Sequence, residues 1–226
     1  MFLRDGLPGD GTLVLIGGGE FSFGDTAVVD RLWVGRAGEG KIGFLPAASG
    51  SSEYGEHFAA YVDAAFEREV EVLPIYRPRD ARRGKNAERI SDCAAVYLGG
   101  GIADQLLETL ADSPVLEALE RKLEAGGVVV AIAAAAQAVG RTVRSLTGNR
   151  ALTGLGWLAE TVVEPNFEPA HDRRLRWLLE EDGVEKGFGL PAGSALFFPP
   201  DGSVQAVGQV FELNDAEDDL EICDND

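Results

Sequence analysis

Gly126–Gly140, GGVVVAIAAAAQAVG, has the pattern of a buried strand that runs directly into a helix. Residues 128–130 are β-branched and wholly apolar, as in a central parallel strand that is covered on both faces. The alanines that follow, with Gln137 among them, favour a helix. In many α/β hydrolases such a strand-to-helix turn carries the catalytic nucleophile. Here residues 131–136 are AIAAAA, without Ser, Cys or Thr. The stretch therefore raises the question of whether a hydrolase scaffold has lost its chemistry.

Other apolar runs of strand length precede this stretch, and helical patterns separate them. The predicted strands are Thr12–Gly17, Lys41–Leu45, Val70–Ile75 and Ala94–Leu98. Strands that alternate with helices imply a doubly wound, mainly parallel sheet. Right-handed connections then place helices on both faces of that sheet. The predicted fold class is therefore α/β.

Three local predictions concern the flanking segments. The helix Asp25–Val34 is expected to bury Ala27, Val28, Leu32 and Trp33. The helix after the central turn is expected to span Ala134–Ser145. Near the C-terminus, short apolar runs separated by turn residues predict β-hairpins. Those runs are Gly187–Leu190, Ser194–Phe198, Val204–Val207 and Val210–Leu213.

Several polar or glycine-rich segments follow the predicted strands. In sheets of this type, ligands bind beyond the carboxyl ends of the strands. The segments are GGGE at 17–20, PAAS at 46–49, GGG at 99–101 and AIAAAAQ at 131–137. They supply the pocket candidates Gly18, Gly19, Glu20, Ser49 and Gln137. The first glycine cluster is not GxGxxG, which disfavours dinucleotide binding.

The charge of the chain disfavours two classes of partner. The formal net charge of −18 repels nucleic acid and anionic membranes, so neither is expected as a partner. Residues 214–226 hold seven acids and no bases, which is typical of a solvated acidic tail. Residues 1–213 are expected to form one α/β domain. The short segment 1–11 before the first strand is expected to be a turn-rich lead-in.

The cysteine and histidine content does not favour a metal site. Cys93 and Cys223 lie far apart, and His57 and His171 are the only histidines, so no metal-ligand spacing or disulfide framework is present. No cofactor is expected. The N-terminus lacks the pattern of a signal peptide, and no apolar run is long enough to span a membrane. We therefore expect a cytoplasmic protein.

Residues 77–85, RPRDARRGK, form a basic segment in an acidic chain. A solvated loop is the simpler interpretation of this segment. The alternative is a loop that binds an anion or contacts another subunit. If the site accepts acidic groups, its candidate charge partners are Arg77, Arg79, Arg82 and Arg83.

The order of the motifs resembles the cyanophycinase and aspartyl dipeptidase (peptidase E) family of serine peptidases. The matching stretches are IGGGE at 16–20, FLPAAS at 44–49, AAVYLGGGIADQLLETL at 94–110, GGVVVAIAAAAQAVG at 126–140, EPNFEPAHDRRLRWLL at 164–179 and GFGLPAGSALFF at 187–198. The resemblance covers roughly residues 12–213. It implies a fold like that of class I glutamine amidotransferases. It also implies hydrolysis of peptide or isopeptide bonds next to acidic residues.

The same resemblance implies that this chain lacks both reacting side chains. The family turn Gly-x-Ser-Ala-Gly-Ala, laid on residues 131–136, puts the nucleophile at Ala133. The family's Asn-Pro-His-Phe or Asp-x-His-Phe stretch, laid on residues 164–167, puts the general base at Asn166. A methyl group cannot attack a carbonyl carbon, and an amide does not accept a proton near neutral pH. Backbone donors of an oxyanion hole could remain. By resemblance they would come from Gly99, Gly100, Gly101 and Ala134.

Three functions from different classes remain open at this point. The first is a non-catalytic relative that binds a small acidic molecule or peptide, and the resemblance suggests a homodimer. The second is an active hydrolase that uses other residues. Its candidates are a displaced base at His171, or a dyad of His57 with one of Ser49, Ser51 and Ser52. The third is an interaction protein whose pocket is filled.

Overall fold

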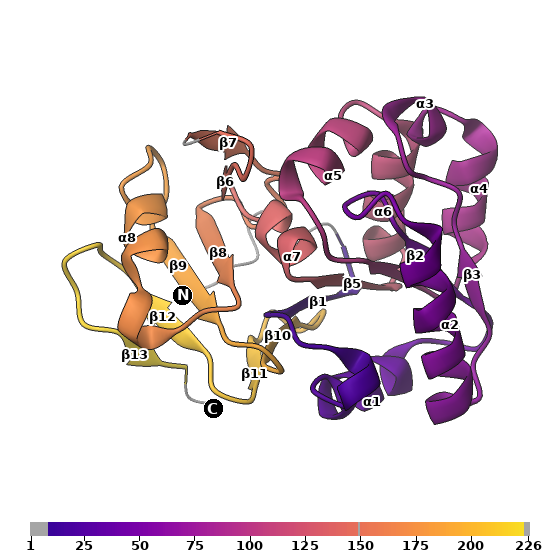
Figure 1. Ribbon diagram of the computed structural model, residues 1–226, viewed down its shortest axis with the longest axis horizontal. Helices are drawn as coiled ribbons and strands as arrows, with labels where there is room; N and C mark the ends of the chain where they lie inside the picture. The colour runs from indigo at the N-terminus through magenta and orange to yellow at the C-terminus, as the bar shows by residue number, and fades with distance from the viewer. Residues whose placement is uncertain (1–8, 149, 224–226) are drawn as a thin grey trace.

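The computed structural model describes residues 9–148 and 150–223. Within them, the main sheet has seven strands in the order β11-β10-β1-β5-β4-β2-β3 (Figure 1). The parallel part consists of β1 (Thr12–Ile16), β5 (Val128–Ile132), β4 (Ala95–Leu98), β2 (Ile42–Leu45) and β3 (Val70–Val72). Two antiparallel strands, β10 (Ala195–Phe198) and β11 (Gln205–Val207), extend it beyond β1. The predicted α/β fold with a mainly parallel sheet is therefore confirmed.

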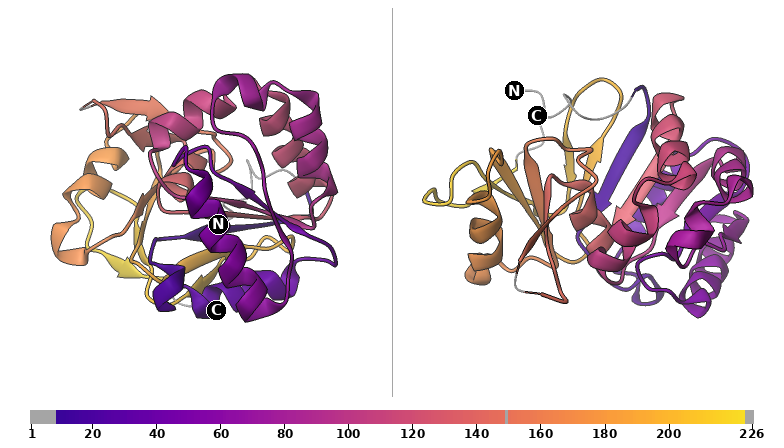
Figure 2. Two further views of the ribbon diagram at one scale, coloured as in Figure 1. Left: turned by 45° about the vertical axis from the view of Figure 1, so that its right-hand side comes forward. Right: turned by 90° about the horizontal axis from the view of Figure 1, so that it is seen from above.

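Helices cover both faces of this sheet, as the figures show (Figures 1 and 2). One face carries α1 (Ala27–Arg36) and α2 (Ser52–Phe66), with the short 3₁₀ helix η1 (Phe21–Phe23). The other face carries α3 (Pro78–Ala81), α4 (Gly84–Asp92), α5 (Ala103–Leu110), α6 (Pro114–Glu124) and α7 (Ala134–Val139). The central strands are consequently covered on both sides, which explains their unbroken apolar sequences.

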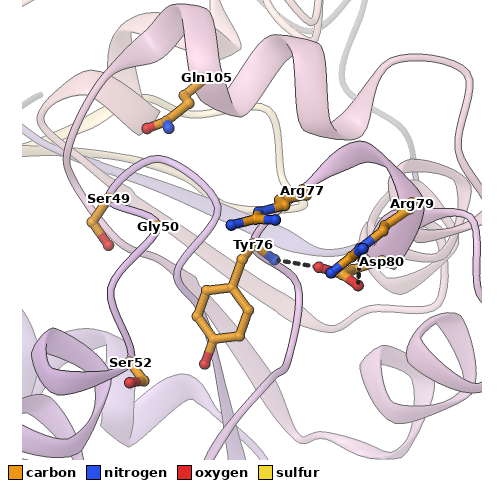
Figure 3. A pocket seen from close by; sticks show the side chains of 8 residues that line it. All are labelled: Ser49, Gly50, Ser52, Tyr76, Arg77, Arg79, Asp80 and Gln105. Atoms are coloured by element: carbon orange, nitrogen blue, oxygen red, sulfur yellow. Dashed lines mark hydrogen bonds and ion pairs between the residues drawn. The ribbon is translucent and has the colours of Figure 1, made fainter.

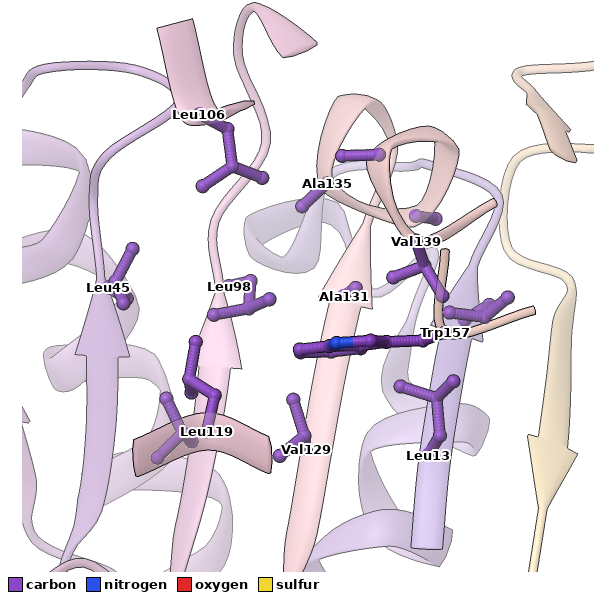
Figure 4. Packing of buried hydrophobic residues seen from close by; sticks show 14 of the residues in the cluster. Leu13, Leu45, Leu98, Leu106, Leu119, Val129, Ala131, Ala135, Val139 and Trp157 are labelled. Atoms are coloured by element: carbon purple, nitrogen blue, oxygen red, sulfur yellow. The ribbon is translucent and has the colours of Figure 1, made fainter. Parts of the chain in front are cut away.

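Alternate residues of the first strand divide between the two faces. Leu13 and Leu15 join the core beneath α5, α6 and α7, whereas Val14 and Ile16 join the core beneath α1 and α2. This follows from the two-residue period of a strand. On the face covered by α5, α6 and α7, the Trp157 ring lies across β5 beneath α7, next to Ala131 and Val129 (Figure 4). The small alanines of α7 and β5 leave room for that ring.

A second sheet lies beside the main one. Its order is β13-β12-β9-β8, formed by β8 (Thr161–Pro165), β9 (Lys186–Leu190), β12 (Phe211–Leu213) and β13 (Glu221–Ile222). The helix α8 (Arg173–Leu179), which follows η2 (Pro169–His171), covers its outer face (Figure 1). Val163 and Phe188 point the other way and join the main core. A two-stranded sheet of β6 (Thr142–Arg144) and β7 (Ala151–Thr153) completes the arrangement.

The C-terminal hairpin prediction is only partly right. The strands β10 and β11 form a hairpin, but β9 pairs in parallel with β8 and antiparallel with β12. The four runs are therefore divided between two sheets: β10 and β11 join the main sheet, and β9 and β12 join the second one. Their turn residues marked the ends of the strands correctly, but turn signals alone do not identify the partner strand.

Two predicted elements end elsewhere. The helix predicted to reach Ser145 stops at Val139, and the β-branched residues Thr142 and Val143 belong to β6 instead. The basic segment 77–85 is not a plain loop, because α3 and the start of α4 lie within it. In the acidic segment, Glu221–Ile222 pairs with β12, while most side chains from 214 to 223 are exposed. Residues 1–8 of the predicted lead-in and 224–226 of the tail lie outside the described residues.

The buried face of α1 differs from the prediction. Val28 and Leu32 are 66% and 38% exposed, while Asp30 is fully buried beside Trp33. The Asp30 carboxylate accepts hydrogen bonds from the Trp33 indole at 2.8 Å and from the hydroxyls of Thr26 at 2.6 Å and Tyr61 at 2.9 Å. Three donors compensate the burial of this carboxylate. A hydrophobic pattern counts Asp30 as polar and so selects the wrong face.

Within the described part of the chain, no helix is both long enough and apolar enough to cross a membrane.

The aromatic core beneath α2 provides a matched test of burial. Phe58 is fully buried, with its ring centroid 4.3 Å from that of Tyr97 and 5.0 Å from that of Phe44. Phe58→Ala should lower the free energy of unfolding by about 3–5 kcal/mol, because a cavity replaces these contacts. Phe23→Ala makes the same change at a side chain that is 85% exposed. It should change the free energy of unfolding by less than about 0.5 kcal/mol. Urea denaturation measures both, and equal losses would contradict the packing.

The start of α5 provides a pH-dependent test. Asp104 accepts hydrogen bonds from the hydroxyls of Ser145 and Thr147 and from the Leu146 backbone N–H at 3.0 Å. Burial alone would raise the pKa of Asp104, but these hydrogen bonds outweigh it and lower the pKa from 3.8 to about 2. Ionised Asp104 therefore stabilises the folded chain above its unfolded-state pKa. That stability is lost as the pH falls from about 4 towards 2.

Asp104→Asn should accordingly be less stable than the native chain at neutral pH, and the difference should shrink across that acidic window. Thermal unfolding at a series of pH values measures it. Glu108→Gln removes one charge from the exposed part of the same helix and controls for net charge. A stability difference that persists unchanged near pH 2 would show that Asp104 acts by some other means.

Candidate functional site

The turn between β5 and α7 holds its central residue in a strained conformation. Ala133 has φ 52° and ψ −118°, a region that costs a residue with a side chain about 1–3 kcal/mol. Two hydrogen bonds fix it: the Ala133 N–H donates to the Ile16 carbonyl at 2.9 Å, and the Gln137 N–H donates to the Ala133 carbonyl at 3.0 Å. A sharp turn of this kind presents the nucleophile of α/β hydrolases at the end of the sheet. Here it presents a half-buried methyl group.

The glycine turn after β4 lies directly against this methyl group. A Cβ placed on Gly100 would be 3.5 Å from the Ala133 Cβ. The Tyr54 hydroxyl lies near the Gly100 backbone, and burial, with the charges of Glu20 and Asp30, raises its pKa to about 12. The structure thus brings Gly100 and Ala133 together.

Asn166 is held next to the same strand end. It follows β8, has φ 49°, and its N–H donates to the Gly17 carbonyl at 2.7 Å. A Cβ on Gly18 would lie 2.1 Å from Asn166 Oδ1, so a glycine is required there for the amide to fit. Carbonyls of the consecutive residues Ile16 and Gly17 therefore bind the backbone N–H groups of Ala133 and Asn166 at the end of β1.

A buried carboxylate lies behind this pair. Glu164, on β8, is 3% exposed and accepts a hydrogen bond from Gln137 Nε2 at 3.2 Å. Arg144 Nη2 lies 3.6 Å and Arg174 Nη1 lies 3.8 Å from Glu164 Oε1. Burial raises the pKa of Glu164, and the two guanidinium groups and Gln137 oppose that rise. Gln137, a pocket candidate from the sequence, therefore has a hydrogen-bond partner in Glu164.

Three cavities open near the carboxyl edge of the sheets. One, of about 400 Å³, includes Asn166, Glu168 and His171. A second, of about 550 Å³, includes Glu20, Tyr54 and His57. A third, also about 550 Å³, includes Ser49, Ser52 and Arg77 (Figure 3). Ala133 is not among the residues that line these three.

The histidine candidates are distributed among different cavities. His171 is exposed, and its Nδ1 lies 2.8 Å from Glu168 Oε2. His57 and Ser52 line separate cavities, and Ser49 Oγ donates to the Pro46 carbonyl at 3.2 Å. The structure therefore places Ser49 and Ser52 in a different cavity from His57, and a dyad of His57 with Ser51 stays a prediction.

Glu20 joins a local polar network as well as lining a cavity. Its carboxylate accepts hydrogen bonds from the N–H of Ser22 at 3.3 Å and from the Ser22 hydroxyl at 3.1 Å, and so caps η1. Its own N–H donates to Asp25 Oδ2 at 2.9 Å. Glu20, a pocket candidate from the sequence, therefore both lines a cavity and caps η1.

The sequence analysis did not single out Glu164, Arg144 or Tyr54 for the site. Glu164 stands two residues before Asn166 in a strand of otherwise apolar residues, which was a usable signal of a buried carboxylate. Arg144 gave no such signal, because it lies in the segment predicted to be the end of a helix, and Tyr54 was not distinguished from other apolar side chains. Within the described residues, no cluster of three or more His, Cys, Asp or Glu side chains could hold a metal ion.

The fold and the turn at Ala133 identify the class of protein as a mainly parallel α/β scaffold with a strand-to-helix turn of the hydrolase type. We call this turn between β5 and α7 the elbow. The model of peptidase family S51 matches residues 13–205, and the chain belongs to that family. A solved structure, that of a peptidase from an acI-B1 Actinobacterium, superposes with a TM-score of 0.76 over 96% of each chain at 20% identity. That likeness shows the shared fold.

Curated relatives agree with this assignment. The cyanophycinase of Trichormus variabilis (strain ATCC 29413 / PCC 7937) is 27% identical over 215 residues, which is 87% of this chain and 70% of that protein. The cyanophycinase of Geminocystis herdmanii (strain PCC 6308) is 25% identical over 217 residues, covering 88% and 78% respectively. The predicted resemblance to the cyanophycinase and peptidase E family is therefore confirmed.

The strained elbow leads to a stability test that does not depend on activity. Ala133→Gly removes the steric cost of positive φ from the folded state. It also makes the unfolded chain more flexible, which lowers stability by about 0.5–1 kcal/mol, and the steric gain exceeds or balances this loss. We expect the free energy of unfolding to stay constant or to rise by up to about 2 kcal/mol. Ala136→Gly, inside α7, should lower it by about 1 kcal/mol. Denaturant titration compares the two, and similar losses in both would mean that the turn is unstrained.

Proposed function

We propose that this chain is a member of peptidase family S51 that binds a small acidic molecule or peptide at the elbow without hydrolysing it. The observation that carries the proposal is Ala133 in the strained turn between β5 and α7, with its methyl group against Gly100. Acyl transfer in this type of scaffold needs an attacking oxygen or sulfur at that position. Removal of the nucleophile cost a well-studied serine protease on the order of 10⁶ in rate.

The position of Asn166 supports the same proposal. Its N–H is bound by the Gly17 carbonyl, one residue beyond the carbonyl that binds Ala133, and the family resemblance puts the general base at this position. An amide side chain accepts and donates hydrogen bonds but does not act as a general base near neutral pH. The two residues can therefore hold a carbonyl or carboxylate group by shape and hydrogen bonding while lacking the means to cleave a peptide bond.

A second candidate function is hydrolysis by a displaced base. One observation favours it: His171 and Glu168 form a histidine–carboxylate pair in the cavity that also contains Asn166. However, the residues lining that cavity include no Ser, Thr or Cys. A base without a nucleophile could at most activate water, so we rank this function below ligand binding.

The test restores the missing groups and looks for turnover. The substrates are α- and β-aspartyl dipeptides, which the family resemblance suggests. The native chain should show no hydrolysis, and Ala133→Ser combined with Asn166→His should show weak hydrolysis. Either substitution alone should be inactive, because the nucleophile and base act as a unit. Ala136→Ser is the matched control, since it adds a hydroxyl group to the same helix away from the elbow.

Two outcomes would overturn the proposal. Hydrolysis by the native chain that disappears in His171→Ala would assign catalysis to the displaced base. Inactivity of the double variant, together with no calorimetric binding of aspartyl dipeptides to the native chain, would remove the elbow as a functional site. The latter result would favour an interaction protein.

A further inference from the structure

The cavity lined by Ser49, Ser52, Tyr76, Arg77 and Gln105 gathers hydrogen-bond donors that have no protein partner. Arg77 extends its guanidinium into the space between the Gly50 turn and the Tyr76 ring (Figure 3). Among the described residues, this guanidinium makes no ion pair or hydrogen bond. An arginine without a carboxylate partner is notable in a chain with a net charge of −18.

The other donors come from three separate elements around the same space. The Tyr76 hydroxyl, the Ser52 hydroxyl and the Gln105 side-chain amide also lack hydrogen-bond partners within the described residues. Gln105, on α5, approaches the Gly50 turn from above, with Nε2 3.9 Å from the position of a Cβ on Gly50. Burial and nearby carboxylates raise the pKa of Tyr76, so its hydroxyl stays protonated and can donate.

The loop that carries Arg77 is held firmly from below. The buried Asn86 donates through Nδ2 to the Asp80 carbonyl at 2.9 Å and to the Pro74 carbonyl at 3.3 Å. Pro78 follows Arg77, which restricts Arg77 to the extended conformation that it adopts. The backbone that carries Arg77 is therefore held in place at the mouth of the cavity, while the Arg77 side chain itself is exposed. A fixed backbone lowers part of the entropic cost of binding.

The one acidic side chain that lines the cavity is already compensated. Asp80 accepts a hydrogen bond from the Tyr76 backbone N–H at 3.4 Å. Its Oδ1 also lies 3.8 Å from Arg79 Nε and 3.7 Å from Arg83 Nη1. Residues 77–85 contain five basic residues and this single acid. This segment therefore carries an excess of positive charge, opposed near Tyr76 by the Glu56 carboxylate.

We propose that this cavity is an oxyanion-binding site, in which Arg77 binds a phosphate or carboxylate group of a small ligand and Tyr76, Ser52 and Gln105 donate the remaining hydrogen bonds. A guanidinium group binds such oxyanions through two parallel hydrogen bonds. The site goes beyond the proposed function, because it requires neither Ala133 nor Asn166. It develops the anion-binding interpretation of the basic segment 77–85 and assigns it to one arginine.

The experiment titrates the full chain with inorganic phosphate and, separately, with succinate, using isothermal calorimetry at constant ionic strength. The native chain should bind at least one of them. Arg77→Ala should weaken that binding about tenfold or more, since it removes a charge-assisted pair. Tyr76→Phe, which removes one hydroxyl donor, should weaken it about threefold to tenfold. Tighter binding of phosphate or of succinate identifies which group the site selects, and either preference supports the proposal.

Arg82→Ala is the matched control, because it removes the same charge from the same segment at an exposed residue that does not line the cavity. Its affinity should stay within about twofold of the native value. Equal weakening by Arg77→Ala and Arg82→Ala would show general charge attraction and overturn the site, as would failure of the native chain to bind either anion. Thermal unfolding of each variant checks that the fold is kept. Aspartyl dipeptide binding at the elbow is scored separately, so either proposal can fail alone.

Discussion

The hydrogen bonds accepted at the end of β1 determine the layout of the functional edge. The Ile16 carbonyl holds the turn at Ala133, and the adjacent Gly17 carbonyl holds Asn166. These contacts join the main sheet to the strand β8 of the second sheet at one point. These contacts bring other atoms so close to positions 17 and 18 that a side chain at either position would collide with them, which explains the two glycines. The edge is thus built from main-chain geometry and does not depend on the identity of the reacting side chains.

Because the edge is built from the main chain, its shape is compatible with the proposed absence of hydrolysis. A scaffold whose turn is fixed by backbone hydrogen bonds keeps its shape with a methyl group at the elbow. The strained conformation of Ala133 is supported by the hydrogen bonds of its N–H and carbonyl groups. The shape of the edge therefore does not require a side chain that attacks a substrate, and the binding proposal rests on this point.

Most of the sheet and the position of the elbow were predictable from the sequence because their signals are local. The valine run 128–130 and the glycine cluster 99–101 each lie within a single turn or strand. The pairing of Glu164 with Arg144 and Arg174 was not predictable, because those residues come from three elements that meet only in the folded chain. The buried face of α1 was missed for a related reason: Asp30 is compensated by a hydroxyl from α2, which a single-helix pattern does not include.

The pairing of the acidic segment with β12 affects how the molecule meets its own copies. A sheet edge with free backbone groups is a template for strand addition and aggregation. Here β13 occupies the edge next to β12, and the segment that carries it is rich in carboxylates. Repulsion between the negative charges of two such segments opposes the addition of a second chain's strand at this edge. The acidic segment therefore disfavours edge-to-edge pairing of two copies of the chain at β13.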